Sequence, residues 1–321
     1  MNQYAVYGLT LQSNRPMDGF APVETEGPRV VIDFAGRPVE RDEGEPFFGN
    51  GFETLWHRDD GTWLLRYVDD RDGAFWTIEL DAAGTRLTIR WTNDALLADI
   101  PAVLQGPGLA AALHLRGVPM LHASVLAIDD SAIALVGAPG AGKSTTAAAF
   151  VARGFALMSD DLGALDIDGS AVSVQAGYPR LRAFADSAHA AGFADADDLP
   201  RVFDAEILGP KRYVTVSAAE GTFQPYATPL RAIYYLMPRI LGMREPAIET
   251  LSKRQALPVL LQNLYSTRFL DERRRVPLIR AIAGVAATVP VRAVQTSDDL
   301  AALPRLVDTI ASDARKINRN G

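Results

Sequence analysis

One short segment of the chain has the residue types and the spacing of a phosphate-binding loop. Residues 137–144 read GAPGAGKS, match the pattern G-x-x-x-x-G-K-[ST] in full, and stand between an apolar strand-like run and a helix-like run. Glycines let the backbone N–H groups of such a loop turn toward a phosphate, and the following helix presents its positive end. We expect Lys143 to reach the β- and γ-phosphates of a nucleoside triphosphate and the Ser144 hydroxyl to bind Mg²⁺.

The alternative for this segment is a glycine-rich turn without a ligand, which the strand and the helix on its two sides disfavour. ATP and Mg²⁺ are therefore the expected cofactors. The residues expected to contact the nucleotide are Gly137, Ala138, Pro139, Gly140, Ala141, Gly142, Lys143, Ser144 and Thr145.

Two neighbouring acids return to the loop after one helix and one strand. Asp160 and Asp161 end the strand-like run FALMSDD. Adjacent side chains at a strand end point to opposite faces, so one acid can face the metal and the other an acceptor. We expect Asp160 to join Ser144 as a metal ligand; an Asx-type turn or a helix cap is the alternative for this pair.

A histidine is predicted to lie at the mouth of the loop. The runs LHASVLAI and SAIALV are separated only by Asp129 and Asp130, which predicts a hairpin with a two-residue turn. In that register paired residue numbers sum to 259, and His122 stands opposite Gly137. A functional role near the phosphates and a structural hydrogen bond both remain open for this histidine.

The elements that position these residues fall into two regions, 1–98 and 99–321. The first is predicted to be β-rich because RVVIDF, TWLLRYV, AFWTIEL and TRLTIRW alternate apolar and polar residues. A helical stretch over 99–116 leads into the second region, where strands and helices alternate. Residues 185–224 are expected to form loops over the site, and LRAIYYLM and VPVRAVQT to form strands. SKRQALPVLLQNLYSTRFL predicts one or two helices, and DDLAALPRLVDTIASDARKI predicts a terminal helix. The fold class is α/β.

The composition of the chain disfavours some classes of binding partner. The net charge of −7 disfavours nucleic acid and anionic membranes as main partners, because both require a basic face. With no cysteine there is no disulfide framework and no cysteine nucleophile. The N-terminus lacks a basic segment followed by an apolar one, so no secretory signal is predicted and a cytoplasmic location is expected. The composition leaves a homo-oligomer open.

The segment from His122 to Asp161 resembles the core of the bacterial HPr kinase/phosphorylase family. The shared features are a histidine in a hairpin, the phosphate loop, a helix that ends in Arg-Gly, and a strand that ends in Asp-Asp. The resemblance implies a P-loop core related to phosphoenolpyruvate carboxykinase, with Lys143 and Ser144 holding nucleotide and Mg²⁺. It also implies that Asp161 accepts the proton of the acceptor hydroxyl and that His122 and Asp160 support it.

The layout outside the core looks more like the HPr-kinase-related proteins of lasso peptide biosynthesis. The segments that carry this resemblance are YAVYGLTLQSNRP, GYPRLRAF, KRYV and PVRAV; a counterpart of the HPr kinase segment with a metal-binding glutamate is not found. Members of that group phosphorylate the C-terminal serine of a precursor peptide, which implies a peptide or small-protein acceptor. Arg180, Arg182, Lys211 and Arg212 are candidates to bind phosphate or a peptide carboxylate, with surface solvation as the alternative.

Two other functions remain open at this point. A small-molecule kinase on the same core would differ only in its acceptor. A non-catalytic module that senses or hydrolyses nucleotide would be expected to lack the Asp160-Asp161 pair.

Overall fold

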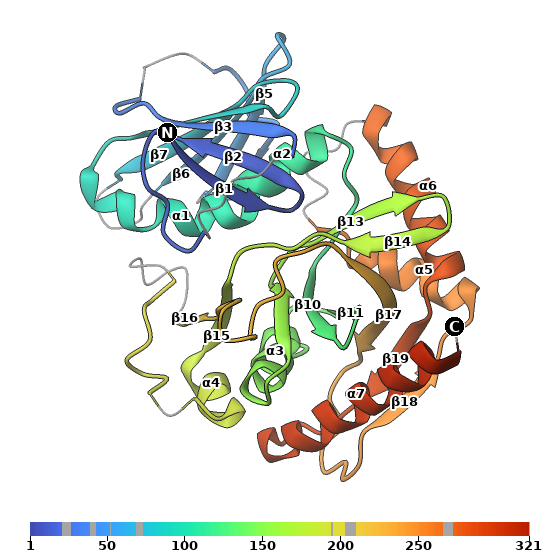
Figure 1. The fold of residues 1–321 in the computed structure, drawn as a ribbon. Helices are drawn as coiled ribbons and strands as arrows, with labels where there is room; N and C mark the ends of the chain where they lie inside the picture. The colour runs from blue at the N-terminus through green and yellow to red at the C-terminus, as the bar shows by residue number, and fades with distance from the viewer. Residues whose placement is uncertain are drawn as a thin grey trace. The chain divides into compact units, whose positions relative to one another are not determined.

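The computed structural model divides the chain into two compact units, and Figure 1 follows the chain through both. The first unit comprises Met1–Gly117, Val202–Gly209 and Ser266–Leu270, and the second comprises Val118–Arg201, Pro210–Tyr265 and Asp271–Gly321. The residues that the structure describes are 1–20, 27–38, 43–51, 53–68, 73–193, 195–202, 210–265 and 272–320.

An eight-stranded sheet forms the first unit, in the order β1-β2-β3-β8-β7-β6-β5-β4. Its central strands contain the four predicted runs, which are thereby confirmed. Their inward side chains, such as Ile32, Leu65, Ile78 and Leu87, are fully buried. The strand bounds are β1 (Asn2–Val6), β2 (Leu9–Ser13), β3 (Arg29–Phe34), β4 (Phe48–Gly49), β5 (Glu53–His57), β6 (Trp63–Val68), β7 (Phe75–Leu80) and β8 (Arg86–Trp91).

The helical stretch expected over 99–116 is present and belongs to the first unit. It consists of η1 (Asp94–Ala98), α1 (Ile100–Val103), the π-helical turn η2 (Leu104–Gly108) and α2 (Leu109–Leu115). α2 packs so closely on the turn between β7 and β8 that a Cβ at Gly84 would lie 2.7 Å from the carbonyl oxygen of Ala112. The boundary between residues 98 and 99 that the sequence suggests therefore falls inside this compact unit, since the helices cover the sheet that precedes them.

The second unit is built on a mixed nine-stranded sheet with the path β12-β10-β11-β17-β14-β13-β9, and β19 and β18 continue from β17. β11, β17 and β19 run parallel to one another, and the other pairs are antiparallel. The strand bounds are β9 (Met120–Leu121), β10 (Ala123–Ile128), β11 (Ser131–Val136), β12 (Ala156–Ser159), β13 (Gly163–Asp168), β14 (Ala171–Val174), β17 (Thr228–Leu236), β18 (Ala247–Thr250) and β19 (Val291–Gln295).

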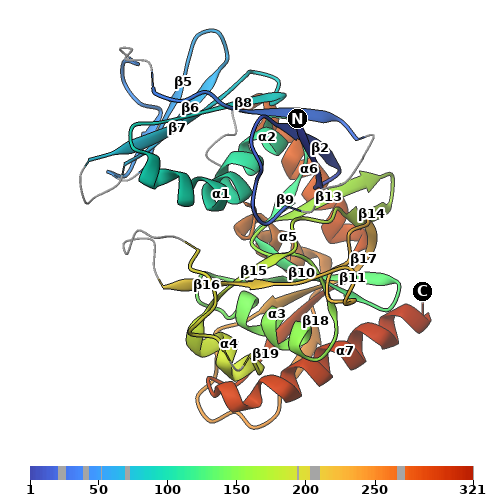
Figure 2. The same ribbon diagram turned by 60° about the vertical axis from the view of Figure 1, so that its left-hand side comes forward.

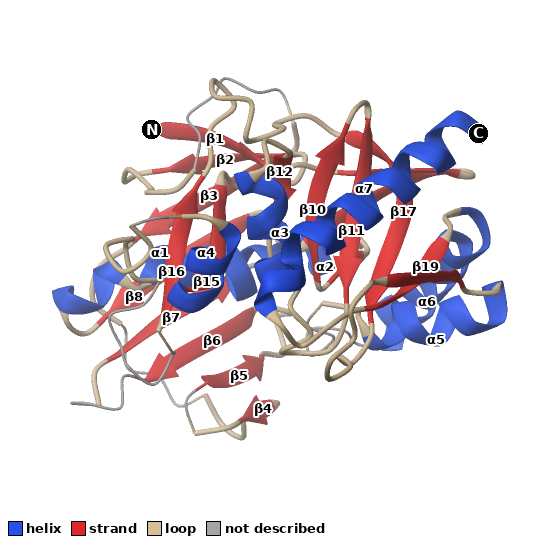
Figure 3. Cartoon of the chain, turned by 90° about the horizontal axis from the view of Figure 1, so that it is seen from below, coloured by secondary structure: helices blue, strands red, loops and turns tan. Residues whose placement is uncertain are grey.

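Helix α7 (Leu303–Asn320) lies across β10, β11 and β17 in Figure 3, and α3 (Lys143–Ala152) packs beside it against β10 and β12. Phe150 of α3 and Ile310 of α7 share one buried cluster with Leu135 and Tyr234 of the sheet. α5 (Lys253–Gln262) and α6 (Glu272–Thr288) pack against each other. The predicted strands at LRAIYYLM and VPVRAVQT, the first helix of the run 252–270 and the terminal helix are confirmed; residues 266–270 lie outside the described part. Mixed α/β is therefore the observed class.

The loops expected over 185–224 include regular structure, so that expectation is wrong in part. α4 (Ala185–Ala191) follows β15 (Arg180–Phe184), which pairs with β16 (Lys211–Thr215) in a two-stranded sheet. Figure 2 shows this pair beside α3 and α4. Leu181, Ala188 and Val214 join the buried cluster of α3, so burial against α3 stabilises short segments whose own periodicity is weak. Residues 194 and 203–209 of this range lie outside the described part.

Within the described part of the chain, no helix has the length and apolar character that crossing a lipid bilayer requires.

Candidate active site

The hairpin before the phosphate loop has the predicted register. Ile128 pairs with Ser131 and Ala123 with Val136, so paired numbers sum to 259 and His122 and Gly137 follow the last pair. Asn263 bridges these two residues, because its carbonyl oxygen accepts the His122 backbone N–H at 2.7 Å and its Oδ1 accepts the Gly137 N–H at 2.9 Å. The end of α5 therefore holds the entrance of the loop.

The loop itself curls onto its own lysine. Lys143 Nζ donates to the carbonyl oxygen of Gly137 at 2.7 Å and to that of Ala138 at 3.4 Å, and the residue is 8% exposed. Burial lowers the pKa of Lys143, although Asp161 and Asp160 oppose this shift. A Cβ at Gly137 would lie 2.8 Å from the carbonyl oxygen of Leu236, so only glycine fits this passage. α3 begins directly after Gly142 and directs its N-terminal end at the loop.

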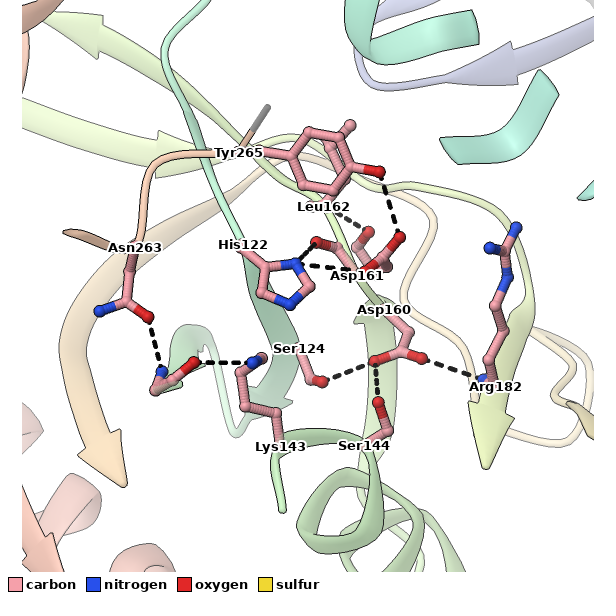
Figure 4. A network of polar contacts seen from close by, with 12 residues as sticks. His122, Ser124, Lys143, Ser144, Asp160, Asp161, Leu162, Arg182, Asn263 and Tyr265 are labelled. Atoms are coloured by element: carbon pink, nitrogen blue, oxygen red, sulfur yellow. Dashed lines mark hydrogen bonds and ion pairs between the residues drawn. The ribbon is translucent and has the colours of Figure 1, made fainter. Parts of the chain in front are cut away.

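Asp160 is a buried carboxylate that joins three segments. Its Oδ1 accepts hydrogen bonds from the hydroxyls of Ser124 at 2.6 Å and Ser144 at 3.1 Å, and its Oδ2 accepts the Arg182 backbone N–H at 3.0 Å. Figure 4 shows these bonds. A serine hydroxyl beside a carboxylate fits Mg²⁺, which takes oxygen ligands and commonly uses one or two carboxylates together with substrate phosphates. Among the described residues no three His, Cys, Asp or Glu side chains cluster around a common metal position.

Asp161 points to a different set of partners. His122 Nδ1 lies 3.2 Å from its Oδ1 and 3.0 Å from its carbonyl oxygen, and the Tyr265 hydroxyl donates to its Oδ2 at 3.2 Å (Figure 4). Burial opposes its ionisation, but the hydrogen bond from His122 and the charge of Arg182 outweigh burial and hold the pKa of Asp161 well below its usual range. Asp161 is therefore an ionised, oriented carboxylate.

The two acids face different partners for a reason other than strand alternation. β12 ends at Ser159, so both acids follow the strand, and Asp161 has a φ of 72° in the left-handed region. A non-glycine residue there carries backbone strain, which tends to persist where surrounding contacts over-determine the conformation. The predicted divergence of the two side chains is present, and the left-handed turn produces it.

A cavity of about 580 Å³ collects these groups in the second unit. It contains most of the predicted loop and both acids. Its lining residues are His122, Ser124, Pro139, Gly140, Gly142, Lys143, Ser144, Thr145, Asp160, Asp161, Arg182, Ala183, Phe184, Ser187, Lys211, Arg239, Asp298 and Leu300.

The four basic candidates divide between the two faces of the β15–β16 pair. Arg182 and Lys211 line the cavity. Arg180 lies on their face, as the register shows, but its guanidinium packs 4.7 Å from the ring of Tyr213 and it does not line the cavity. Arg212 pairs with Ala183 on the opposite face and donates to the carbonyl oxygen of Leu199 at 3.0 Å. The structure thus brings two of the four candidates to the loop.

Several residues of the site were not identified from the sequence, among them Ser124, Asn263 and Tyr265. Ser124 stands two positions after His122, and strand alternation around the predicted hairpin is the signal that points to it. Asn263 and Tyr265 are more than 100 positions beyond the loop and carry no local signal. Only the packing of the end of α5 against β9 places them in the site, where Tyr265 N–H donates to the Met120 carbonyl oxygen at 3.0 Å.

No family model matches the chain. No curated protein matches it either. Among solved structures the chain is similar to the Hpr(Ser) kinase/phosphatase from Coxiella burnetii, with 12% sequence identity over 63% of this chain and 99% of that chain and a TM-score of 0.33. The residues of the site, and not this similarity, carry the proposal that follows.

Proposed function

We propose that this chain is a Mg²⁺-dependent phosphotransferase that moves the γ-phosphoryl group of ATP to a serine hydroxyl of a peptide. The observation that carries the proposal is the bond between Ser144, the last residue of the phosphate loop, and Asp160, with the ionised Asp161 beside it in the same cavity. Phosphoryl transfer depends mainly on positioning and charge neutralisation, and this cavity offers residues for both.

The loop side of the cavity takes the nucleotide. The loop N–H groups and the N-terminal end of α3 favour phosphate, and Lys143 exchanges the carbonyl oxygens of Gly137 and Ala138 for a charged acceptor. Ser144 and Asp160 are the residues that would hold Mg²⁺, with Ser124 and the Arg182 N–H orienting Asp160. Bound Mg²⁺ would neutralise charge on the phosphates.

Asp161 serves the acceptor. The serine oxygen attacks the γ-phosphorus, the bond from that phosphorus to the oxygen of the departing ADP breaks, and the serine proton passes to Asp161 and then to water. A carboxylate with a low pKa is a weak base, but in a loose transition state the proton leaves late and orientation of the hydroxyl counts most. His122 and Tyr265 hold the carboxylate in place, and Arg182 and Lys211 place positive charge beside it.

The peptide class of the acceptor rests on the resemblance of the layout to the kinases of lasso peptide biosynthesis, whose acceptor is the C-terminal serine of a precursor peptide. Arg182 and Lys211 in the cavity support an acceptor that carries a carboxylate near its hydroxyl, because guanidinium and ammonium groups both bind carboxylates.

Mass spectrometry tests the proposal directly. The protein is incubated with ATP, Mg²⁺ and a peptide that ends in serine, and the same peptide ending in alanine is the control. We expect the serine peptide alone to gain the mass of one phosphoryl group, and the Lys143→Ala protein to leave it unmodified. Phosphorylation of a small metabolite but of no peptide would instead identify a small-molecule kinase, and ATP binding without any transfer would identify a nucleotide-sensing module.

A further inference from the structure

The first unit contains a second cavity, which the proposed chemistry does not use. It measures about 250 Å³ and is lined by Pro38, Glu43, Arg58, Leu64, Arg66, Phe75, Thr77, Glu79 and Arg90. Most of these side chains alternate with the buried core residues of β6, β7 and β8, so they lie on the outer face of the sheet. All residues that line the larger cavity with the phosphate loop belong to the second unit.

Two arginines of this cavity stand side by side across one threonine. Arg66 of β6 and Arg90 of β8 each pair with Thr77 of β7, which is buried. Strands β5 to β8 can be followed in Figure 3. Directly paired residues on neighbouring strands share a face, so the two guanidinium groups flank the same threonine.

The acids that line the cavity form ion pairs with a third arginine, Arg58. Arg58 forms ion pairs with Glu43 at 2.7 Å and with Glu79 at 2.6 Å, and the hydrogen bond with Glu43 contributes most to raising the pKa of Arg58. Glu43 and Glu79 are the two acids among the lining residues. The negative charges of Glu43 and Glu79 therefore neutralise Arg58, and they neutralise Arg66 and Arg90 to a smaller extent.

Among the described residues, no carboxylate neutralises the guanidinium groups of Arg66 and Arg90. The guanidinium of Arg66 lies 4.4 Å from the ring centroid of Phe75 and 5.5 Å from that of Trp56, and its buried Nε has no hydrogen-bond partner among the described residues. Arg90 donates to the backbone carbonyls of Ala35 at 3.5 Å and Arg37 at 3.4 Å. Neither arginine forms an ion pair with an acid in the described part of the chain.

We propose that this cavity binds a carboxylate of the acceptor peptide, held by Arg66 and Arg90. The planar fork of a guanidinium matches the two oxygens of a carboxylate, and a ring stacked on Arg66 preorganises that fork. Leu64 and Phe75 add an apolar wall, which suits a side chain or a chain end rather than a free inorganic ion. This inference rests on the proposed function, and it assigns acceptor capture to the first unit.

Binding to the full-length protein is measured without ATP, so the result does not depend on phosphoryl transfer. Three synthetic serine peptides differ only in their carboxylates: one has an internal aspartate and an amidated end, one has a free C-terminal carboxylate only, and one has neither. The four tryptophans of the chain, Trp56, Trp63, Trp76 and Trp91, all lie in the first unit, so tryptophan fluorescence reports on it. Calorimetry gives the affinities.

We expect at least one carboxylate peptide to bind more tightly than the neutral peptide, and that peptide identifies the source of the carboxylate. Arg66→Gln and Arg90→Gln should each weaken its binding by roughly tenfold, the scale for a lost charge-assisted hydrogen bond. Arg86→Gln is the matched control, because Arg86 lies on β8 with a side chain that is 54% exposed and does not line the cavity. Arg66→Lys keeps the charge without the fork and should fall between Arg66→Gln and the wild type.

Equal binding of all three peptides to the wild type would overturn the inference. So would unchanged affinity in both Arg66→Gln and Arg90→Gln, or an equal loss in Arg86→Gln. If circular dichroism shows that Arg66→Gln fails to fold, the affinities of Arg90→Gln and Arg66→Lys for the carboxylate peptide test the inference instead. A wild type that binds the carboxylate peptide through these arginines but transfers no phosphoryl group would contradict the proposed function and leave the carboxylate site standing.

Discussion

The Tyr265 hydroxyl donates to Oδ2 of Asp161 at 3.2 Å, although 104 positions separate the two residues. The centroid of the Tyr265 ring also lies 5.8 Å from that of the His122 imidazole, which contacts the same carboxylate. Asn263, two positions earlier, contacts Gly137 and the His122 backbone. One short segment after α5 therefore holds both the loop entrance and the acid that the proposed mechanism assigns to the acceptor.

Tyr265→Phe should reduce phosphoryl transfer about tenfold, the scale for losing a hydrogen bond to a charged group. The ring and its packing stay, and the loop is untouched, so the affinity for ATP should not change. Single-turnover kinetics at saturating ATP measures the step. Tyr226→Phe is the control because Tyr226 is 74% exposed. A wild-type rate in Tyr265→Phe would show that His122 alone is sufficient to orient Asp161.

Asp161→Asn should leave nucleotide binding intact and lower transfer by roughly 10²-fold or more, because it removes the group that orients the hydroxyl and accepts its proton. Asp160→Asn should instead raise the Mg²⁺ concentration needed for half-maximal rate, since Asp160 contacts Ser144. The two variants are compared in a Mg²⁺ titration at saturating ATP. Near-wild-type transfer by both would mean that the acids are structural.

The low pKa of Asp161 predicts a specific dependence of stability on pH. Its pKa is lower in the folded protein than in the unfolded chain, so its contribution to the free energy of unfolding is fully present above the unfolded value of about 3.9 and is lost as the pH falls through the folded value. Ionisation of Asp161 should therefore leave the difference in free energy of unfolding between wild type and Asp161→Asn unchanged from about pH 5 to about pH 8. Below about pH 4 this difference should shrink. Urea titrations at several pH values measure it; a difference that vanishes already near neutral pH contradicts the ionised state of Asp161.

Lys143→Ala should abolish measurable binding of ATP with Mg²⁺. Among the described residues the lysine donates to two loop carbonyls, so its loss should lower the free energy of unfolding by about 1.5 to 3 kcal/mol, the scale for a hydrogen bond of a charged group. Calorimetric titration gives the affinity and thermal unfolding the stability, with the exposed Lys253→Ala as control. Wild-type affinity in Lys143→Ala would remove this loop from the nucleotide site.

Substitution of a basic residue of β15 or β16 should affect acceptor binding only where the side chain lies on the face toward the cavity. Arg182→Gln and Lys211→Gln should each raise the apparent Michaelis constant for a peptide acceptor by roughly tenfold, because both side chains line the cavity. Arg212→Gln should not, because its side chain lies on the other face and bonds Leu199. Steady-state kinetics with varied peptide at saturating ATP compares the three. An equal effect of all three would indicate a general charge effect instead of a defined subsite.

The hairpin of β10 and β11 and the loop that follows it could be predicted from the sequence, because both depend on residues close together in the chain. The register of β10 and β11 follows from one two-residue turn and the alternation of apolar residues, so the positions of His122 and Gly137 at the loop mouth could be predicted. The strand, loop and helix around Lys143 likewise depend on neighbouring residues. The weakly periodic α4 and β16 could not be predicted, because burial against α3 stabilises them.

Residue types and spacing alone identify a glycine-rich loop with the phosphate-binding pattern, a serine at its end and a pair of acids that return after one helix and one strand. The direction in which each of these side chains points depends on the tertiary fold. The left-handed backbone of Asp161, the contacts of Asn263 and Tyr265, and the separation of Arg212 from Lys211 all depend on segments distant in the chain or on strand pairing. Such contacts form only when the chain folds, because no local periodicity encodes which distant hydroxyl or amide meets a given carboxylate or N–H group.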